Sequence, residues 1–209
     1  MLQKDGFDLW ADNYDQTVQI IEENNKFPFA GYKQILNVIY NEIMQNKNSK
    51  VLDIGFGTGV LTTELYKKGH IITGIDFSAR MLEIAKAKMP NARLIQSDIN
   101  DGIPLELKEE KFDYIVSTYA LHHLSDEDKV SFILELLPLL AEKGIILIGD
   151  ISFDSREALE NCRLENVDSW DPDEFYFVAK EIKSDLVDRV IVNYNQISYC
   201  GGIYWISNK

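Results

Sequence analysis

The sequence of 209 residues predicts an α/β fold, in which helices cover both faces of a doubly wound, mostly parallel sheet. The first observation is a series of short, continuous apolar segments rich in Val and Ile, as strands buried on both faces must be. The second is that segments with helical spacing alternate with these strands. The third is a glycine-rich turn, residues 55–59, between the first strand and its following helix.

Two amphipathic helices are expected before the first strand, packed on one edge of the sheet. In the first, apolar residues recur at intervals of three and four, and they include Trp10 and Tyr14. These two aromatic residues either anchor the core or form part of a lid over a ligand. The second helix should run from Tyr32 to Met44, where the same spacing returns.

The predicted first strand covers 50–54, and its helix starts at Val60 and stops near Gly69. Between them, Gly55, Gly57 and Gly59 allow a ligand to approach the backbone and permit positive φ in a sharp turn. The helix N-terminus then faces that ligand. This turn is therefore the first candidate binding element.

Acidic residues stand at the ends of the first three predicted strands. Asp53 belongs to the first strand, and Asp76 ends the second strand, where an acid can bind both hydroxyls of a ribose. Phe77 follows directly and either packs on a purine or belongs to the core. Asp98 follows the third strand, 92–96, and either accepts a hydrogen bond from an adenine amino group or is a solvated turn residue. The N–H of the next residue, Ile99, can reach a nitrogen of the adenine ring.

Two histidines follow the fourth predicted strand, 112–118. Ligands bind at strand carboxyl ends in open α/β sheets, so Ser117 to His122 should line the reaction side of the site. His122 and His123 are the candidate general bases, because an unperturbed imidazole titrates near neutral pH. The alternative for each is a structural histidine satisfied by backbone groups.

The rest of the chain completes the predicted α/β pattern. The residue pair Ser125 and Asp128 should cap a helix that continues through 130–140, and Ser78 should cap the helix after the second strand. A fifth parallel strand is expected at 145–150 and a helix at 175–186. Two strands, 189–199 and 203–207, should form a hairpin around the Gly201-Gly202 turn signal.

Composition limits the partners of the protein. A formal net charge of −13 repels the phosphate backbone of nucleic acids and anionic membranes. The first residues lack the apolar core of a secretory signal, and Cys162 and Cys200 form no C-x-x-C motif, so we expect reduced thiols in the cytoplasm. Three histidines without ligand spacing predict no metal site.

The pattern Asp53-x-Gly55-x-Gly57-x-Gly59 resembles the S-adenosylmethionine (SAM) signature of class I methyltransferases. Three segments make the chain similar to the uncharacterised YrrT-type methyltransferases of Bacillus and relatives: 7–15, 73–78 and 115–124. The resemblance implies a Rossmann-like sheet of seven strands. It further implies one domain with a helical cap (1–47), a SAM-binding core (48–153) and a C-terminal helix and hairpin (154–209).

By this likeness Gly55, Asp76 and Asp98 bind SAM, and Tyr14 closes over its methionine end. The implied reaction is an SN2 transfer of the methyl group from SAM to a small acceptor, leaving S-adenosylhomocysteine (SAH). A catalytically silent SAM-sensing or interaction module is the alternative. A nicotinamide dehydrogenase is disfavoured, because Val60 stands where the dinucleotide fingerprint has Gly or Ala.

Overall fold

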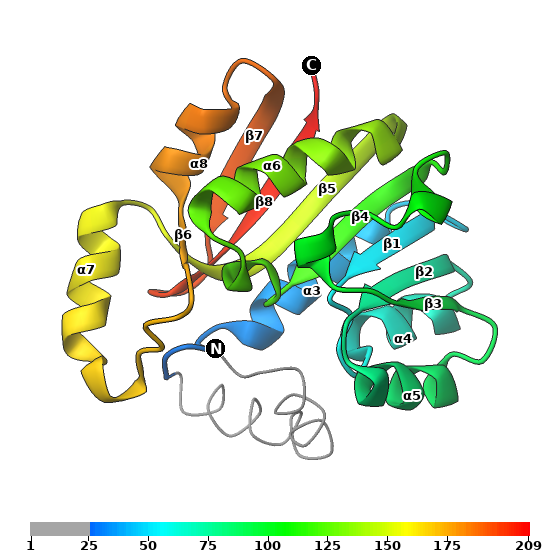
Figure 1. Ribbon diagram of the computed structural model, residues 1–209, viewed down its shortest axis with the longest axis horizontal. Coiled ribbons are helices and arrows are strands. Elements are labelled where there is room, and N and C mark those ends of the chain that lie inside the picture. Colours follow the sequence, from blue (N-terminus) through cyan, green and yellow to red (C-terminus); the bar gives the residue numbers. More distant parts are fainter. Residues whose placement is uncertain (1–25) are drawn as a thin grey trace.

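The computed structural model describes residues 26–209, which form a mixed sheet with helices on both faces (Figure 1). Seven strands follow the order β3-β2-β1-β4-β5-β8-β7, and the two-residue β6 pairs with β5 outside this order. Strands β1 to β5 are parallel to one another, whereas β8 is antiparallel to both β5 and β7. The predicted doubly wound sheet with an antiparallel C-terminal hairpin is confirmed. The strands are β1 (Lys50–Ile54), β2 (Ile71–Asp76), β3 (Arg93–Gln96), β4 (Phe112–Thr118), β5 (Leu140–Phe153), β6 (Phe177–Val178), β7 (Val190–Gln196) and β8 (Gly201–Asn208).

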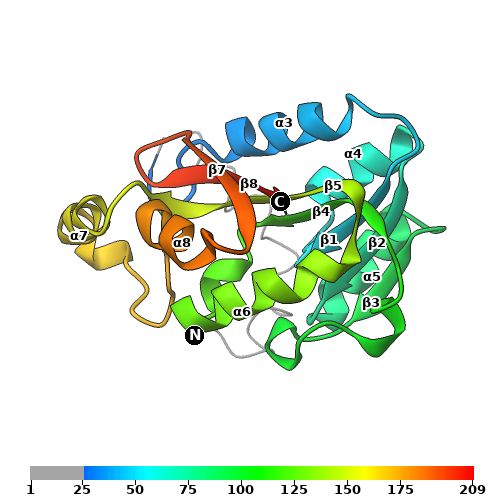
Figure 2. The same ribbon diagram turned by 90° about the horizontal axis from the view of Figure 1, so that it is seen from above.

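The helices divide the core into two clusters, one on each face of the sheet. Buried residues of α3, α4, α5 and α7 join one cluster, and those of α6 and α8 join the other. Figure 2 shows α3 on one side of the sheet and α6 and α8 on the opposite side. The helices are α3 (Tyr32–Ile43), α4 (Val60–Lys67), α5 (Ala79–Lys88), α6 (Asp126–Leu136), α7 (Arg156–Glu165) and α8 (Ala179–Leu186).

Helix α3 lies over the face of the sheet, so the expected packing on an edge is wrong. The reason is visible at Gly149 of β5, where an added Cβ would lie 2.3 Å from Ile35 Cγ2 and 2.9 Å from Ile39 Cδ1. A strand without a side chain here lets the helix pack closely against the middle of the sheet. The other expected helix, with Trp10 and Tyr14, lies outside the described residues.

Both predicted serine caps are confirmed. The Ser78 hydroxyl accepts a hydrogen bond from the Met81 N–H at 3.1 Å, and the Ser125 hydroxyl accepts one from the Asp128 N–H at 3.2 Å. Helix α6 ends at Leu136 rather than at 140. A 3₁₀ turn that contains Pro138 follows it, because proline cannot continue the α-helical hydrogen bonding.

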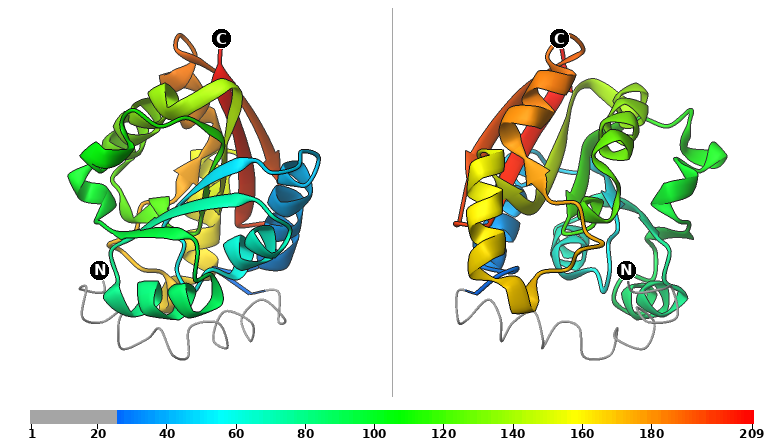
Figure 3. Two further views of the ribbon diagram at one scale, coloured as in Figure 1. Left: turned by 90° about the vertical axis from the view of Figure 1, so that its right-hand side faces the viewer. Right: turned by 60° about the vertical axis from the view of Figure 1, so that its left-hand side comes forward.

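The C-terminal segment differs from its prediction in three ways. Residues 175–178 are not helical, because Phe177 of β6 pairs with Ser152 of β5 and the Phe175 N–H donates to the His122 carbonyl at 2.8 Å. Helix α7, which packs beside β5 (Figure 3), was not predicted. Gly201 and Gly202 belong to β8, and the turn uses 197–200 instead.

Close packing explains the glycine pair within β8. A Cβ at Gly201 would lie 3.0 Å from Ile35 Cδ1, and one at Gly202 would lie 2.5 Å from the Tyr194 ring. Glycine inside a strand often marks such a close approach rather than a turn. Among residues 26–209, no helix combines the length and apolar character needed to span a bilayer.

Candidate functional site

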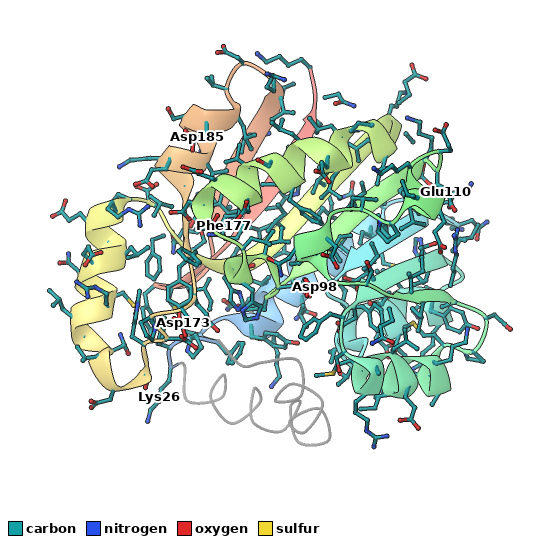
Figure 4. All side chains as sticks on the ribbon, viewed as in Figure 1. Lys26, Asp98, Glu110, Asp173, Phe177 and Asp185 are labelled. Carbon is teal, nitrogen blue, oxygen red and sulfur yellow. The ribbon has the colours of Figure 1, made fainter. Side chains whose placement is uncertain are left out.

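A cavity of about 210 Å³ opens at the carboxyl ends of β1, β2, β3 and β4. Most of the residues predicted to bind the cofactor line it, and His123 lines its other end. Figure 4 shows one of them, Asp98, in the segment that follows β3. The lining residues that the sequence predicted are Asp53, Gly55, Gly57, Asp76, Phe77, Asp98, Ile99 and His123.

The glycine turn forms the floor of this cavity. Gly57 has φ +56° and nothing lies within 4 Å of the position that its Cβ would take, so the backbone is open to a ligand there. Gly55 has φ +70°, and a Cβ on it would lie 2.4 Å from the Ala120 Cβ. The positive φ that the sequence predicted is confirmed at both positions.

The Asp76 carboxylate joins the end of β2 to the glycine turn and to the start of α5. Its Oδ2 accepts a hydrogen bond from the Gly57 N–H at 2.8 Å, and its Oδ1 accepts one from the Ser78 N–H at 2.9 Å. The carboxylate is therefore held in a fixed position at the cavity wall.

Asp53 is buried beside the cavity with one oxygen unsatisfied. Its Oδ2 accepts a short hydrogen bond from the Thr62 hydroxyl, whereas Oδ1 has no hydrogen-bond partner among residues 26–209. Burial raises the pKa of this carboxyl to about 7, the Asp76 carboxylate adds to the rise, and the Thr62 hydrogen bond opposes it. A buried acceptor without a partner is costly, so this oxygen indicates a place for a ligand donor or cation.

Three further predicted residues lie at the β2 and β3 side of the cavity. Phe77 is half-buried directly after Asp76. The Asp98 Oδ1 accepts hydrogen bonds from the Asn100 N–H at 2.9 Å and from the Asn100 side-chain amide at 2.8 Å. These bonds orient the Asp98 carboxylate beside Ile99 at the cavity wall. The described structure thus brings together an aromatic ring, a carboxylate and a backbone N–H.

Aromatic residues add to the cavity lining: Tyr119 lies in the 117–122 segment that was predicted to line the site, whereas Tyr32 was not predicted there. Tyr32 and Tyr119 line the cavity with their ring centroids 5.1 Å apart, and Phe29 packs on Tyr119 at 5.4 Å. Tyr119 directly follows β4 with φ +52°, an uncommon conformation for a residue with a side chain. Its ring lies against Tyr32 at the start of α3 and against Phe29 in the segment before that helix.

Two predicted binding residues lie behind the cavity rather than on its surface. The buried Ser117 hydroxyl donates to the Ile54 carbonyl at 3.0 Å, which ties β4 to β1. Gly59 caps α4, and an added Cβ there would meet the Met89 side chain at 3.1 Å. In the described structure both residues support the lining residues.

The two histidines have different surroundings. His122 is buried, with its Nδ1 2.7 Å from Asp150 Oδ1. Backbone N–H groups hold that carboxylate, because Oδ2 accepts from Leu121 at 3.1 Å and Oδ1 accepts from Ile151 at 2.7 Å. His123 is partly exposed and lines the cavity, with its ring centroid 4.2 Å from that of His122.

The charges around the pair shift the two imidazoles in opposite directions. Burial disfavours protonation of His122, but the nearby Asp150 and Glu174 carboxylates outweigh it and raise its pKa. Burial and, to a smaller extent, the neighbouring His122 together lower the pKa of His123 to about 3. The imidazole at the cavity is therefore neutral near pH 7.

Glu174 lies beside the two histidines, and the sequence analysis did not single it out. It lies in the loop between α7 and β6, where Figure 4 labels its neighbour Asp173. Its Oε1 is 3.7 Å from His122 Nε2 and 4.0 Å from His123 Nδ1, and its Oε2 accepts a hydrogen bond from the Tyr176 hydroxyl at 2.8 Å. This loop has no periodic pattern in the sequence that could have indicated its position.

Sequence comparisons identify the family. Residues 51–144 match a family model described as a methyltransferase domain. An uncharacterized methyltransferase of Oceanobacillus iheyensis is 38% identical over 157 residues, which cover 75% of this chain and 70% of the relative. One of Alkaliphilus oremlandii is 33% identical over 185 residues, 88% of this chain and 82% of the relative. The chain belongs to the class I SAM-dependent methyltransferases.

Its relatives within that class include the uncharacterized methyltransferases of Bacillus-group bacteria, as the sequence resemblance implied. Solved structures agree on the fold. A complex of DhpI with SAM and HEP superposes with a TM-score of 0.71 at 19% identity, covering 98% of this chain and 95% of that one. A SAM-dependent methyltransferase of Clostridium acetobutylicum superposes with a TM-score of 0.70 at 17% identity, covering 93% of this chain and 98% of that one.

Proposed function

We propose that this methyltransferase transfers the methyl group of SAM to a small molecule that enters the cavity at its Tyr119 and His123 end. The observation that carries the proposal is the buried Oδ1 of Asp53, which has no hydrogen-bond partner among residues 26–209. An ammonium group, such as that of the methionine part of SAM, satisfies this oxygen and its charge. The open backbone at Gly57 leaves room for the ligand beside it.

The remaining predicted residues are assigned to the rest of the cofactor. Asp76 would accept hydrogen bonds from both ribose hydroxyls, and Phe77 would pack on the adenine ring. Asp98 would accept from the adenine amino group, with the Ile99 N–H donating to a ring nitrogen. Each assignment is supported by the place of the residue in the cavity wall. Tyr14 keeps its proposed role over the methionine end from the family resemblance alone.

Alignment and exclusion of water supply most of the catalysis in this proposal. When bound, SAM supplies a methyl group on a sulfonium centre. The rings of Tyr32 and Tyr119 would stabilise that cation through their faces. His123 at the cavity, with His122 behind it, defines the side from which the acceptor's nucleophilic atom approaches the methyl carbon.

A small acceptor agrees with the charge of the chain, since a formal net charge of −13 opposes binding of a nucleic acid. The cavity is also lined largely by apolar and aromatic side chains, as sites for small ligands are. We place the reaction in the cytoplasm, which the two buried thiols without a disulfide, Cys162 and Cys200, support.

The test is a calorimetric titration of SAM and SAH into the full chain, followed by a screen of small thiols, phenols and carboxylic acids with labelled SAM. We expect binding that Asp76→Ala abolishes. Asp76→Ala also removes two hydrogen bonds from backbone N–H groups, so a second variant is needed. Asp98→Ala serves for this, and it should lower the affinity for SAM and SAH about tenfold. A folded wild-type chain that binds neither ligand would disprove the proposal, and binding without turnover would favour the silent SAM-binding module.

A further inference from the structure

The side chains of His122, His123 and Glu174 converge beside the acceptor end of the cavity. Glu174 Oε1 lies 3.7 Å from His122 Nε2 and 4.0 Å from His123 Nδ1, and all three atoms lie within 4.8 Å of one another. Both measured distances are longer than a hydrogen bond. Three atoms that can each offer a lone pair therefore surround one small space.

The position of Asp150 makes this convergence unusual. Because Asp150 accepts a hydrogen bond at His122 Nδ1, the neutral form of His122 carries its proton there and directs the Nε2 lone pair toward Glu174. An ionised Glu174 has only acceptor atoms. In that form the two acceptors repel, and a cation between them, either a proton on Nε2 or a metal ion, removes the repulsion.

The distances suit a metal ion better than a direct contact. Ligand atoms that lie 2.0–2.2 Å from zinc at tetrahedral angles are separated by roughly 3.4 Å. The measured 3.7 and 4.0 Å require only small side-chain movements to reach that value. The space between these atoms thus approximates the face of a tetrahedral site.

The outer contacts of the three side chains are those of metal ligands. Ligating histidines usually donate their second ring N–H to a carboxylate, as His122 does to Asp150, and ligating carboxylates are themselves hydrogen-bonded, as Glu174 is by Tyr176. The nearest buried cation, Lys129, is paired with Asp126 at 2.8 Å. Local charge therefore favours an added cation.

We propose that His122, His123 and Glu174 bind one divalent transition-metal ion of the zinc type, with an open coordination position toward the acceptor. Two histidines and one glutamate form a known donor set of open zinc sites. The ligand spacing in the sequence did not predict this site, because Glu174 joins the histidines only through the fold. Binding of the ion stands independently, whereas its role in catalysis rests on the proposed methyl transfer.

In that role the ion would select a small thiol or hydroxyl acceptor and hold it as its anion, because a bound cation lowers the pKa of such a group. The acceptor releases its proton to solvent. Its sulfur or oxygen then forms a bond to the methyl carbon while the bond from that carbon to the sulfonium breaks, and the bonding pair remains on the sulfur of SAH.

The experiment titrates Co²⁺ and Zn²⁺, each alone, into the full metal-free chain without an affinity tag. Binding is followed by calorimetry and by the visible absorption of Co²⁺, and SAH binding is measured on the same samples. We expect one Co²⁺ per chain with a tetrahedral spectrum. Glu174→Gln should weaken Co²⁺ binding at least about tenfold. Asp168→Asn, an exposed acid changed in the same way, should leave it unaltered.

His123→Ala serves as the second variant if Glu174→Gln fails to fold, and it should also weaken Co²⁺ binding. A folded wild-type chain that binds neither metal would overturn the proposal, as would equal Co²⁺ binding by Glu174→Gln and Asp168→Asn. SAH binding separates the two proposals. Metal binding without SAH binding would leave the metal site standing and remove the methyltransferase reaction from it.

Discussion

Binding of SAH should release a proton from Asp53 at slightly acidic pH. The pKa of this buried carboxyl is raised to about 7, so about 90% of it is protonated at pH 6 and about half at pH 7. An ammonium group beside Oδ1 favours the carboxylate and lowers that pKa. We therefore expect release of about 0.9 proton per SAH at pH 6 and about 0.5 at pH 7.

The assay is calorimetry in two buffers with different ionisation enthalpies, since the difference in apparent binding enthalpy gives the number of protons released. The amino group of the ligand does not contribute at pH 6, because its pKa of about 7.7–8.0 keeps it protonated when free. Asp53→Asn is the control and should release no proton. Identical enthalpies in both buffers at pH 6, or equal release by Asp53→Asn, would refute the assignment of Asp53 to the ammonium group.

The remaining predictions concern single changes in the cavity. The pKa of Asp53 lies about 3 units above its ordinary 3.8 in the folded chain, so the stability that this carboxyl contributes falls as the pH rises from about 4 to 7. Asp53→Asn should therefore raise the free energy of unfolding at pH 8 by up to about 4 kcal/mol, as measured by urea denaturation. Gly57→Ala should lower the free energy of unfolding by only about 1 kcal/mol yet lose SAH affinity, because its Cβ would enter open space. Gly55→Ala should lower the free energy of unfolding by about 3 kcal/mol or more, because its Cβ would meet Ala120. Thermal melting and SAH titration check both variants. Phe77→Ala should weaken SAH binding about tenfold in calorimetry, with little change in melting temperature.

The cofactor side of the cavity was predictable because it depends on local patterns. A buried parallel strand, a glycine turn and an amphipathic helix each leave a periodic signal in the sequence, and strand order then brings their ends together. Asp53, Asp76 and Asp98 accordingly line one cavity. Asp150 follows the same strand-end rule, and that rule could have identified it as well.

The strand-end rule places a residue but does not give the direction of its side chain. Ser117 lies near the end of β4 and His122 in the 3₁₀ turn that follows, yet Ser117 bonds to a neighbouring strand and His122 bonds to Asp150. Successive side chains of a strand point to opposite faces, and a loop removes even that regularity. Hydrogen bonds formed in the folded chain decide the outcome, and these leave no signal in one sequence.

The proposed acceptor end of the cavity has a different origin from the proposed cofactor side. Glu174 reaches the histidines from the loop after α7, and Tyr32 reaches Tyr119 from the start of α3, so segments far apart in the chain build it together. Loops tolerate change much more readily than buried strands. Relatives can therefore share the cofactor residues and differ in acceptor, which is why the 19% identity with DhpI supports the fold and carries no acceptor to this chain. The chemistry of the acceptor has to be inferred from the side chains at this end, where Tyr32, Tyr119 and His123 line the cavity and His122 and Glu174 lie beside His123.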